Sequence, residues 1–193
     1  MPAGLNLVAG GVRSGKSRFA LQLAEGHPSP RIFVATAQVL DHEMQIRVAA
    51  HQRERNNRYA TIEEPLELPQ VLVQANPNAV VVVDCLTLWL SNLLLADRSE
   101  LDIRRKIKEV IAARIGCPGA TIFVSNEVGM GIVPENTLAR RFRDLSGIMH
   151  QTIAGRCHGL YLAAMGTVLR LRPAPVEVCD NIGMGSVFTI VPS

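Results

Sequence analysis

The sequence predicts an α/β protein in which a mostly parallel sheet carries helices on both faces. Apolar, β-branched runs alternate with helical patterns along the chain, which is typical of this class. The unbroken run Val80–Val83 fits a central strand that is covered on both sides. A glycine-rich motif joins the first apolar run to the first helical pattern. We expect one domain over residues 1–193, with 173–193 as an irregular C-terminal extension.

Each element follows from a local pattern. Strand-like runs fall at 5–9, 31–36, 79–83, 120–125, 159–164 and 168–171. Helical patterns fall at 16–25, 41–57, 87–96, 100–115 and 135–155. The first helix is expected to end at Gly26, the second to begin at the N-cap Asp41, and the last to follow Pro134. Because ligands of such sheets bind where strands end, we expect a site near residues 10–17, 36, 84 and 126–127.

Residues Gly10 to Ser17 match the motif G-x-x-x-x-G-K-[S/T]. In this motif backbone N–H groups wrap a polyphosphate, the lysine (here Lys16) reaches the β- and γ-phosphates, and the hydroxyl of Ser17 binds Mg²⁺. The motif lies between a strand and a helix, the context that this function needs, whereas the alternative is a glycine-rich surface turn. The sequence therefore predicts a RecA-like P-loop fold that binds a nucleoside triphosphate.

Asp84 ends the four-valine run. In P-loop proteins an acidic residue at this place holds Mg²⁺ opposite the P-loop hydroxyl. Ser17 and Asp84 are therefore the predicted metal ligands. The alternative is an ordinary strand-ending aspartate in a turn.

The helix predicted over 41–57 places His51 on one face with Met44 and Val48. On this pattern alone, a packed or surface histidine is favoured over a catalytic one. Four arginines surround it, either as a solvated face or as phosphate contacts, and composition does not choose between the two: Arg47, Arg53, Arg55 and Arg58.

The segment after the 120–125 strand contains Gly129 and Gly131, which allow a close approach to a ligand or a neighbouring chain. The helix that follows carries Arg140, Arg141 and Arg143 next to Asp144. These arginines form either a solvated basic face or a set of substrate contacts.

Composition limits the classes of function. A net charge of +3 and an aromatic content of 4% suit a small polyanionic ligand and argue against nucleic acid as a partner. The four cysteines are widely spaced, which favours reduced thiols. Residues 79–96 switch from β-branched to leucine-rich, as a strand and a buried helix would, so we expect no stable membrane insertion. With no signal-like N-terminus, a cytoplasmic protein is expected.

Six strings, in this order and spacing, resemble one family over about residues 5–172. They are Gly-Gly-Val-Arg-Ser-Gly-Lys-Ser at 10–17, Val-Ala-Thr-Ala at 34–37, Asp-His-Glu-Met-Gln-Ile-Arg-Val-Ala-Ala-His at 41–51, Asp-Cys-Leu-Thr at 84–87, Asn-Glu-Val-Gly-Met-Gly-Ile-Val-Pro-Glu-Asn at 126–136 and Arg-Arg-Phe-Arg-Asp at 140–144. The chain resembles the bifunctional adenosylcobinamide kinase / adenosylcobinamide-phosphate guanylyltransferase family of cobalamin biosynthesis. This combination is more specific than the P-loop alone.

The resemblance implies two reactions, with GTP and ATP as substrates. A nucleoside triphosphate phosphorylates adenosylcobinamide, and GMP then passes from GTP to the product through a GMP-histidine, which the resemblance assigns to His51. His51 and Lys16 are the implied catalytic residues, Mg²⁺ is the cofactor, and a homo-oligomer is expected. The implied nucleotide contacts are Gly10, Gly11, Val12, Arg13, Ser14, Gly15, Lys16, Ser17, Ala35, Thr36, Ala37, Gln52, Arg53, Glu54, Arg55, Glu63 and Asp84.

The chain departs from the family pattern at three places. Asn56 follows Arg55 where the family continues with Pro, His150 precedes Gln151 where the family has Asn, and Val168 replaces a Pro. These changes affect the loop near the guanine and the C-terminal contacts, and leave the P-loop, His51 and Asp84 in place. Two other functions are compatible with the P-loop: a regulatory or mechanical NTPase, and a kinase without guanylyltransferase activity.

Overall fold

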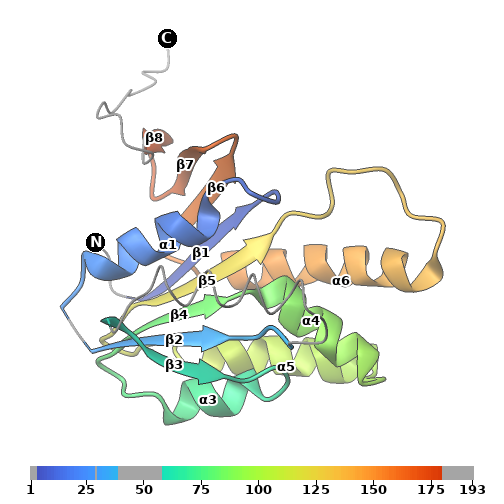
Figure 1. The fold of residues 1–193 in the computed structure, drawn as a ribbon, viewed down its shortest axis with the longest axis horizontal. Helices are drawn as coiled ribbons and strands as arrows, with labels where there is room; N and C mark the ends of the chain where they lie inside the picture. Colours follow the sequence, from blue (N-terminus) through green and yellow to red (C-terminus); the bar gives the residue numbers. More distant parts are fainter. Residues whose placement is uncertain (1–3, 29, 39–57, 180–193) are drawn as a thin grey trace.

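The computed structural model describes residues 4–28, 30–38 and 58–179. The elements are, in chain order, β1 (Leu5–Gly10), α1 (Lys16–Glu25), β2 (Arg31–Ala35), β3 (Ala60–Glu63), α3 (Leu68–Gln74), β4 (Val80–Asp84), α4 (Leu86–Leu95), α5 (Glu100–Ala112), β5 (Thr121–Asn126), α6 (Thr137–Ala154), β6 (Gly159–Ala164), β7 (Thr167–Arg172) and β8 (Glu177–Cys179) (Figure 1).

Within these ranges the strands form one eight-stranded sheet in the order β3-β2-β4-β5-β1-β6-β7-β8. The strands from β3 to β6 pair in parallel, and β7 and β8 extend the sheet antiparallel. This confirms the predicted mostly parallel sheet. Only β5 separates the parallel strands β1 and β4. The loop after β1 and the end of β4 therefore lie close together, at the carboxyl ends of the strands.

The four-valine run is a central strand, as predicted. Its side chains alternate between the two faces, because successive residues of a strand point to opposite sides. Val80 and Val82 pack in the cluster that contains Phe19 of α1. Val81 and Val83 pack in the cluster that contains Trp89 of α4. Burying each of these valines stabilises the fold by about 1.5–3 kcal/mol.

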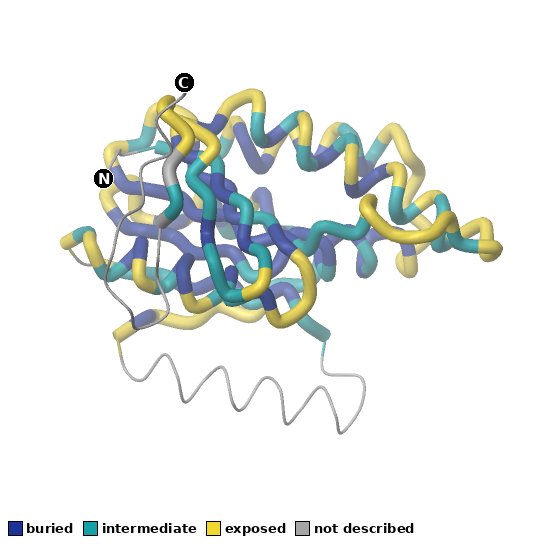
Figure 2. Tube along the Cα trace, turned by 90° about the horizontal axis from the view of Figure 1, so that it is seen from above, coloured by how far each residue is buried: buried dark blue, intermediate teal, exposed yellow. Residues whose placement is uncertain are grey.

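Helices cover both faces of the sheet, with more helices on one face than on the other. Figure 1 shows α1 on one side of the sheet and α3, α4 and α5 on the other. The α1 side is closed by Phe19, Ala20 and Leu23. On the opposite side, α4 is buried almost all round, and its Trp89 Nε1 donates to the carbonyl of Leu66 at 3.0 Å. Figure 2 shows buried strands at the centre and exposed residues along the outer helices.

The predicted strands and helices are confirmed to within a few residues wherever the structure describes them. The helix predicted over 41–57 lies outside the described residues. Three short elements were not predicted: β3, whose four residues are all exposed, the seven-residue α3, and β8. Strand β8 corrects the expectation that the chain after residue 173 is irregular throughout. None of the described helices is long and apolar enough to cross a membrane, and residues 79–96 form β4 and α4 as predicted.

Candidate active site

The loop between β1 and α1 owes its shape to two glycines. A Cβ on Gly10 would lie 2.2 Å from the carbonyl oxygen of Ala163 in β6, so a larger residue would push β1 and β6 apart. Gly15, the N-cap of α1, has a φ of 95°, which L side chains rarely adopt. Since the first N–H groups of a helix have no partner within it, the loop presents donors to an anion at the N-terminus of α1.

Lys16 extends back into this loop. Its side chain is buried, and Nζ donates to the carbonyl of Gly11 at 3.0 Å. Burial lowers the pKa of Lys16 from its usual value, and the charges of Asp84 and Cys85 oppose that change. The negative charge of Asp84 thus favours the charged ammonium, and the predicted roles of both residues remain predictions.

The loop also holds a buried hydroxyl. In the described part of the chain, Ser14 Oγ is shielded from solvent and has no hydrogen-bond partner. A buried hydroxyl without a hydrogen-bond partner costs about 1–3 kcal/mol of stability. Such a group therefore usually has a hydrogen-bond partner when the ligand of the protein is bound. A phosphate oxygen would supply it.

The site offers the donors that Mg²⁺ prefers. Ser17 lies in the first turn of α1 and Asp84 ends β4, and both are half-buried. Among the described residues no three or more His, Cys, Asp or Glu side chains gather into a metal site. One hydroxyl and one carboxylate fit an ion that takes its remaining ligands from phosphate and water, which is how Mg²⁺ is commonly bound.

Thr36 links the end of β2 to the end of β4. Its hydroxyl donates to the carbonyl of Cys85 at 2.7 Å and accepts from the Cys85 N–H at 2.9 Å. Its N–H donates to the carbonyl of Asp84, and its own carbonyl accepts from Asn92 Nδ2 at 2.8 Å. Its N–H and its hydroxyl thus hold the backbone of Asp84 and Cys85, and its predicted nucleotide contact remains a prediction.

The remaining predicted contacts fall into three groups. Ala35 and Ala37 flank Thr36 at the same edge as the P-loop and are half-buried. Glu63 is exposed at the end of β3, and three strands separate it from β1. His51, the predicted catalytic residue, and the predicted contacts at 52–55 lie outside the described residues.

A polar cluster beside the P-loop was not predicted as a unit. Ser125 Oγ lies 2.6 Å from His150 Nε2, and His150 Nδ1 lies 3.5 Å from Glu127 Oε2. Asn126 Nδ2 donates to Thr87 Oγ1 at 3.1 Å, which joins the end of β5 to α4. The signal in the sequence is limited to polar residues at the end of an apolar strand and to the departure at His150.

The arginines of α6 bind backbone carbonyls. Arg140 donates to Pro134 at 3.0 Å, Arg143 to Gly129 at 2.9 Å, and Arg141 to the carbonyl of Arg98 at 3.3 Å. Two of these bonds fasten the 127–136 segment to α6. These arginines therefore have partners within the chain, and a role in contacting substrate stays a prediction.

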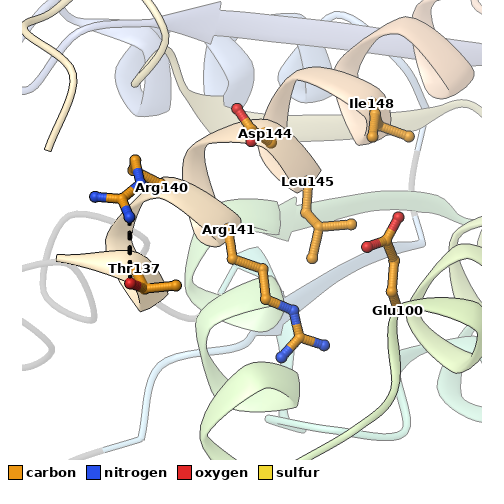
Figure 3. A pocket seen from close by; sticks show the side chains of 7 residues that line it. All are labelled: Glu100, Thr137, Arg140, Arg141, Asp144, Leu145 and Ile148. Atoms are coloured by element: carbon orange, nitrogen blue, oxygen red, sulfur yellow. Dashed lines mark hydrogen bonds between the residues drawn. The ribbon is translucent and has the colours of Figure 1, made fainter. Parts of the chain in front are cut away.

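An open pocket of about 270 Å³ lies where α5 and α6 meet. Figure 3 shows the side chains of α6 that line it, together with Glu100 at the start of α5. Its lining residues are Glu100, Thr137, Arg140, Arg141, Asp144, Leu145 and Ile148. None of them is among the predicted nucleotide contacts.

Comparison with known proteins gives a consistent result. The family described as cobinamide kinase / cobinamide phosphate guanyltransferase matches residues 6–171. The bifunctional adenosylcobalamin biosynthesis protein CobP of Pseudomonas aeruginosa is 42% identical over 174 residues, which covers 89% of this chain and 99% of that protein. The bifunctional adenosylcobalamin biosynthesis protein CobU of Escherichia coli is 38% identical over 179 residues, covering 86% and 98%.

Solved structures of other proteins share the fold. The RadB recombinase is similar with a TM-score of 0.54 at 16% identity, covering 92% of this chain and 86% of that one. The flagellar accessory protein FlaH from Methanocaldococcus jannaschii has a TM-score of 0.50 at 13% identity, covering 91% and 75%. At these identities the likeness concerns the fold alone, and it confirms the predicted RecA-like P-loop architecture.

Proposed function

This chain belongs to the cobinamide kinase / cobinamide phosphate guanyltransferase family, and on that premise we propose that it phosphorylates adenosylcobinamide and then attaches GMP to the product. A nucleoside triphosphate donates its γ-phosphoryl group in the first reaction. GTP donates GMP in the second, with release of pyrophosphate and formation of adenosylcobinamide-GDP.

The observation that carries this proposal is the loop after β1. It holds the buried Lys16 ammonium against the Gly11 carbonyl, at the carboxyl ends of the parallel strands, where Asp84 ends β4 and where such sheets bind ligands. Charge develops on the phosphate oxygens during both reactions, and preformed donors of this kind stabilise it. Ser17 and Asp84 would hold Mg²⁺ at this loop, and the ion would supply positive charge that neutralises part of the same charge.

His51 is the proposed nucleophile of the second reaction. An unperturbed imidazole has a pKa near 6.5, so about three-quarters of it is neutral and nucleophilic at pH 7. Its attack on the α-phosphorus of GTP forms a phosphorus–nitrogen bond as the bond to pyrophosphate breaks. The GMP then passes to the phosphate of the first product, so that one difficult displacement becomes two easier ones.

Labelling tests this route directly. The protein is incubated with GTP labelled at the α-phosphate, denatured, and split into acidic and neutral portions. We expect label that survives denaturation, is lost in acid as a phosphoramidate is, and is absent from His51→Ala. His158→Ala is a matched control. His158 is exposed and directly precedes β6, so it lies at the amino ends of the parallel strands, whereas the P-loop lies at their carboxyl ends. A wild-type protein that hydrolyses GTP without taking up label would refute the transferase proposal.

We further propose that the protein works as a homo-oligomer in the cytoplasm. The resemblance of its sequence strings to the family supports this proposal. Light scattering of the purified protein at several concentrations measures the oligomeric state, and a monomer at every concentration would contradict it.

A further inference from the structure

The polar cluster at the end of β5 connects the protein interior to the edge of the P-loop. Ser125 is fully buried, the His150 side chain is 12% exposed, and the Glu127 side chain is 24% exposed. Glu127 Oε1 also accepts the N–H of Gly129 at 2.6 Å. The carboxylate is thus held from two sides and remains the most accessible member of the cluster.

The position of Glu127 relates it to the nucleotide site. Its N–H donates to the carbonyl of Gly10, the first residue of the P-loop, at 2.9 Å. Glu127 directly follows β5. This strand lies between β1, which leads to Lys16, and β4, which ends at Asp84. The backbone of Glu127 therefore lies beside the first residue of the P-loop, and its carboxylate faces Gly129 and His150.

The same three residue types form the triad of serine hydrolases. In this cluster, however, the serine is the buried member and the carboxylate is the exposed one. A nucleophilic serine must be open to substrate, and Ser125 is not. Burial lowers the pKa of His150, although Glu127 opposes this, so the neutral imidazole is favoured. Because the Glu127 carboxylate only accepts, the single proton of the neutral ring is assigned to Nδ1, which faces Glu127, and Nε2 then accepts from the Ser125 hydroxyl.

The other described carboxylates near this edge have different surroundings. Glu64 Oε1 accepts two backbone N–H groups in the turn before α3. Asp144 is exposed on α6 and lines the pocket against α5. Asp84 is the proposed magnesium ligand. Glu127 alone among these combines partial exposure, fixed orientation and contact with the P-loop backbone.

We propose that the Glu127 carboxylate accepts the proton of the substrate hydroxyl in the kinase step, and that His150 and Ser125 position it. This inference rests on the function proposed above. A bond forms between the hydroxyl oxygen and the γ-phosphorus, while the bond from that phosphorus to the β-phosphate oxygen breaks. The electron pair of that bond leaves with the nucleoside diphosphate, and the hydroxyl proton moves to Glu127 and then to solvent.

The guanylyl transfer does not need this base. Its first nucleophile is a neutral imidazole, and its final acceptor is a phosphate monoester, which has a second pKa of about 6 and is mostly ionised at neutral pH. Loss of the Glu127 base should therefore affect the two reactions differently. That difference separates this proposal from a general defect in nucleotide binding.

Glu127→Gln provides the main test, because it keeps the size of the side chain and one acceptor oxygen, which can still accept the N–H of Gly129, and removes its basicity. Kinase turnover is measured as nucleoside diphosphate released with cobinamide, alongside labelling by α-labelled GTP. We expect kcat of the kinase step to fall by about 10²–10⁴-fold, the usual contribution of general base catalysis. The KM for nucleotide and the labelling should stay within about threefold of wild type on the same reasoning.

Glu135→Gln is the matched control, because Glu135 is an exposed carboxylate of the same segment. Kinase turnover in Glu127→Gln close to that of Glu135→Gln would overturn the proposal. An equal fall in kinase turnover and labelling would also overturn it, since Glu127 would then belong to the cradle. Absence of both activities in wild type is a separate result, which removes the proposed function before any variant is compared.

The positioning role of His150 is tested by two substitutions. His150→Asn retains a donor for Glu127 at the place of Nδ1, whereas His150→Leu retains none. We expect kcat of the kinase step to fall at least tenfold further in His150→Leu, with an unchanged KM for nucleotide. Equal kcat values in the two folded variants would overturn the role. If His150→Leu does not fold, Ser125→Ala replaces it, with an expected severalfold loss in kcat and no loss in labelling.

Discussion

Thr36 provides the sharpest test of how this site is built. In Thr36→Val the side chain keeps its shape and loses its hydroxyl, which is buried and bonded to both the N–H and the carbonyl of Cys85. The Cys85 carbonyl retains a second donor, the N–H of Trp89 at 3.1 Å. The Cys85 N–H has no such second partner among the hydrogen bonds of the described residues, so it would be left buried and unsatisfied.

One orphaned buried donor costs about 1–3 kcal/mol. For a chain of this size, 1 kcal/mol corresponds to a change in Tm of about 2–4 °C. At about 2 kcal/mol, the middle of this range, Thr36→Val should lower Tm by about 4–8 °C. Thr36→Ser keeps the hydroxyl and removes one methyl group, so we expect it to lower the free energy of unfolding by only about 0.8 kcal/mol.

Thermal unfolding followed by circular dichroism measures both variants against wild type. The Mg²⁺ concentration needed for half-maximal kinase activity should also rise in Thr36→Val, because Asp84 directly precedes Cys85. A Thr36→Val protein that melts within 1 °C of wild type, or a serine variant as unstable as the valine variant, would refute this reasoning.

Three further predictions concern charged groups. Lys16→Ala should lower both activities by at least about 10²–10³-fold with little effect on the circular dichroism spectrum, because the ammonium acts on transition-state charge; near wild-type turnover in either reaction would contradict a shared site. Asp84→Asn should weaken the Mg²⁺ dependence of both steps, and an unchanged metal titration would count against its role as a ligand. Burial lowers the pKa of His150, so the unfolded chain takes up this proton at a higher pH than the folded one; stability should be full above about pH 6.5 and fall below it, by up to about 1.4 kcal/mol per pH unit. His150→Asn should flatten the slope of Tm between pH 7 and 5, and equal slopes would exclude this group as the cause.

Much of the fold follows from the sequence because the relevant signals are local. The four valines of β4 indicate a strand buried on both faces wherever they occur, and the P-loop motif carries its own strand and helix. The unpredicted elements are those whose local signal is weak. Strand β3 has no buried residue, and α3 and β8 span only seven and three residues.

The same distinction between local signals and long-range contacts applies to the site. Its P-loop and Asp84 are local signatures, since each lies directly at the end of an apolar strand. The contact between Thr36 and Cys85 joins residues 49 apart, and the contact between Ser125 and His150 joins residues 25 apart. Strand register and the packing of α6 create both contacts, and neither leaves a periodic trace in the sequence.

The arginines of α6 show the limit most clearly. Their pattern allowed either solvent or substrate as the partner, and the tertiary structure supplied further partners, the carbonyls of the 127–136 segment and of Arg98. By itself the sequence determined the layered architecture, the polyphosphate cradle and the family. Only the tertiary structure decided which polar groups satisfy one another, because a hydrogen bond depends on distances between atoms that the chain brings together from far apart.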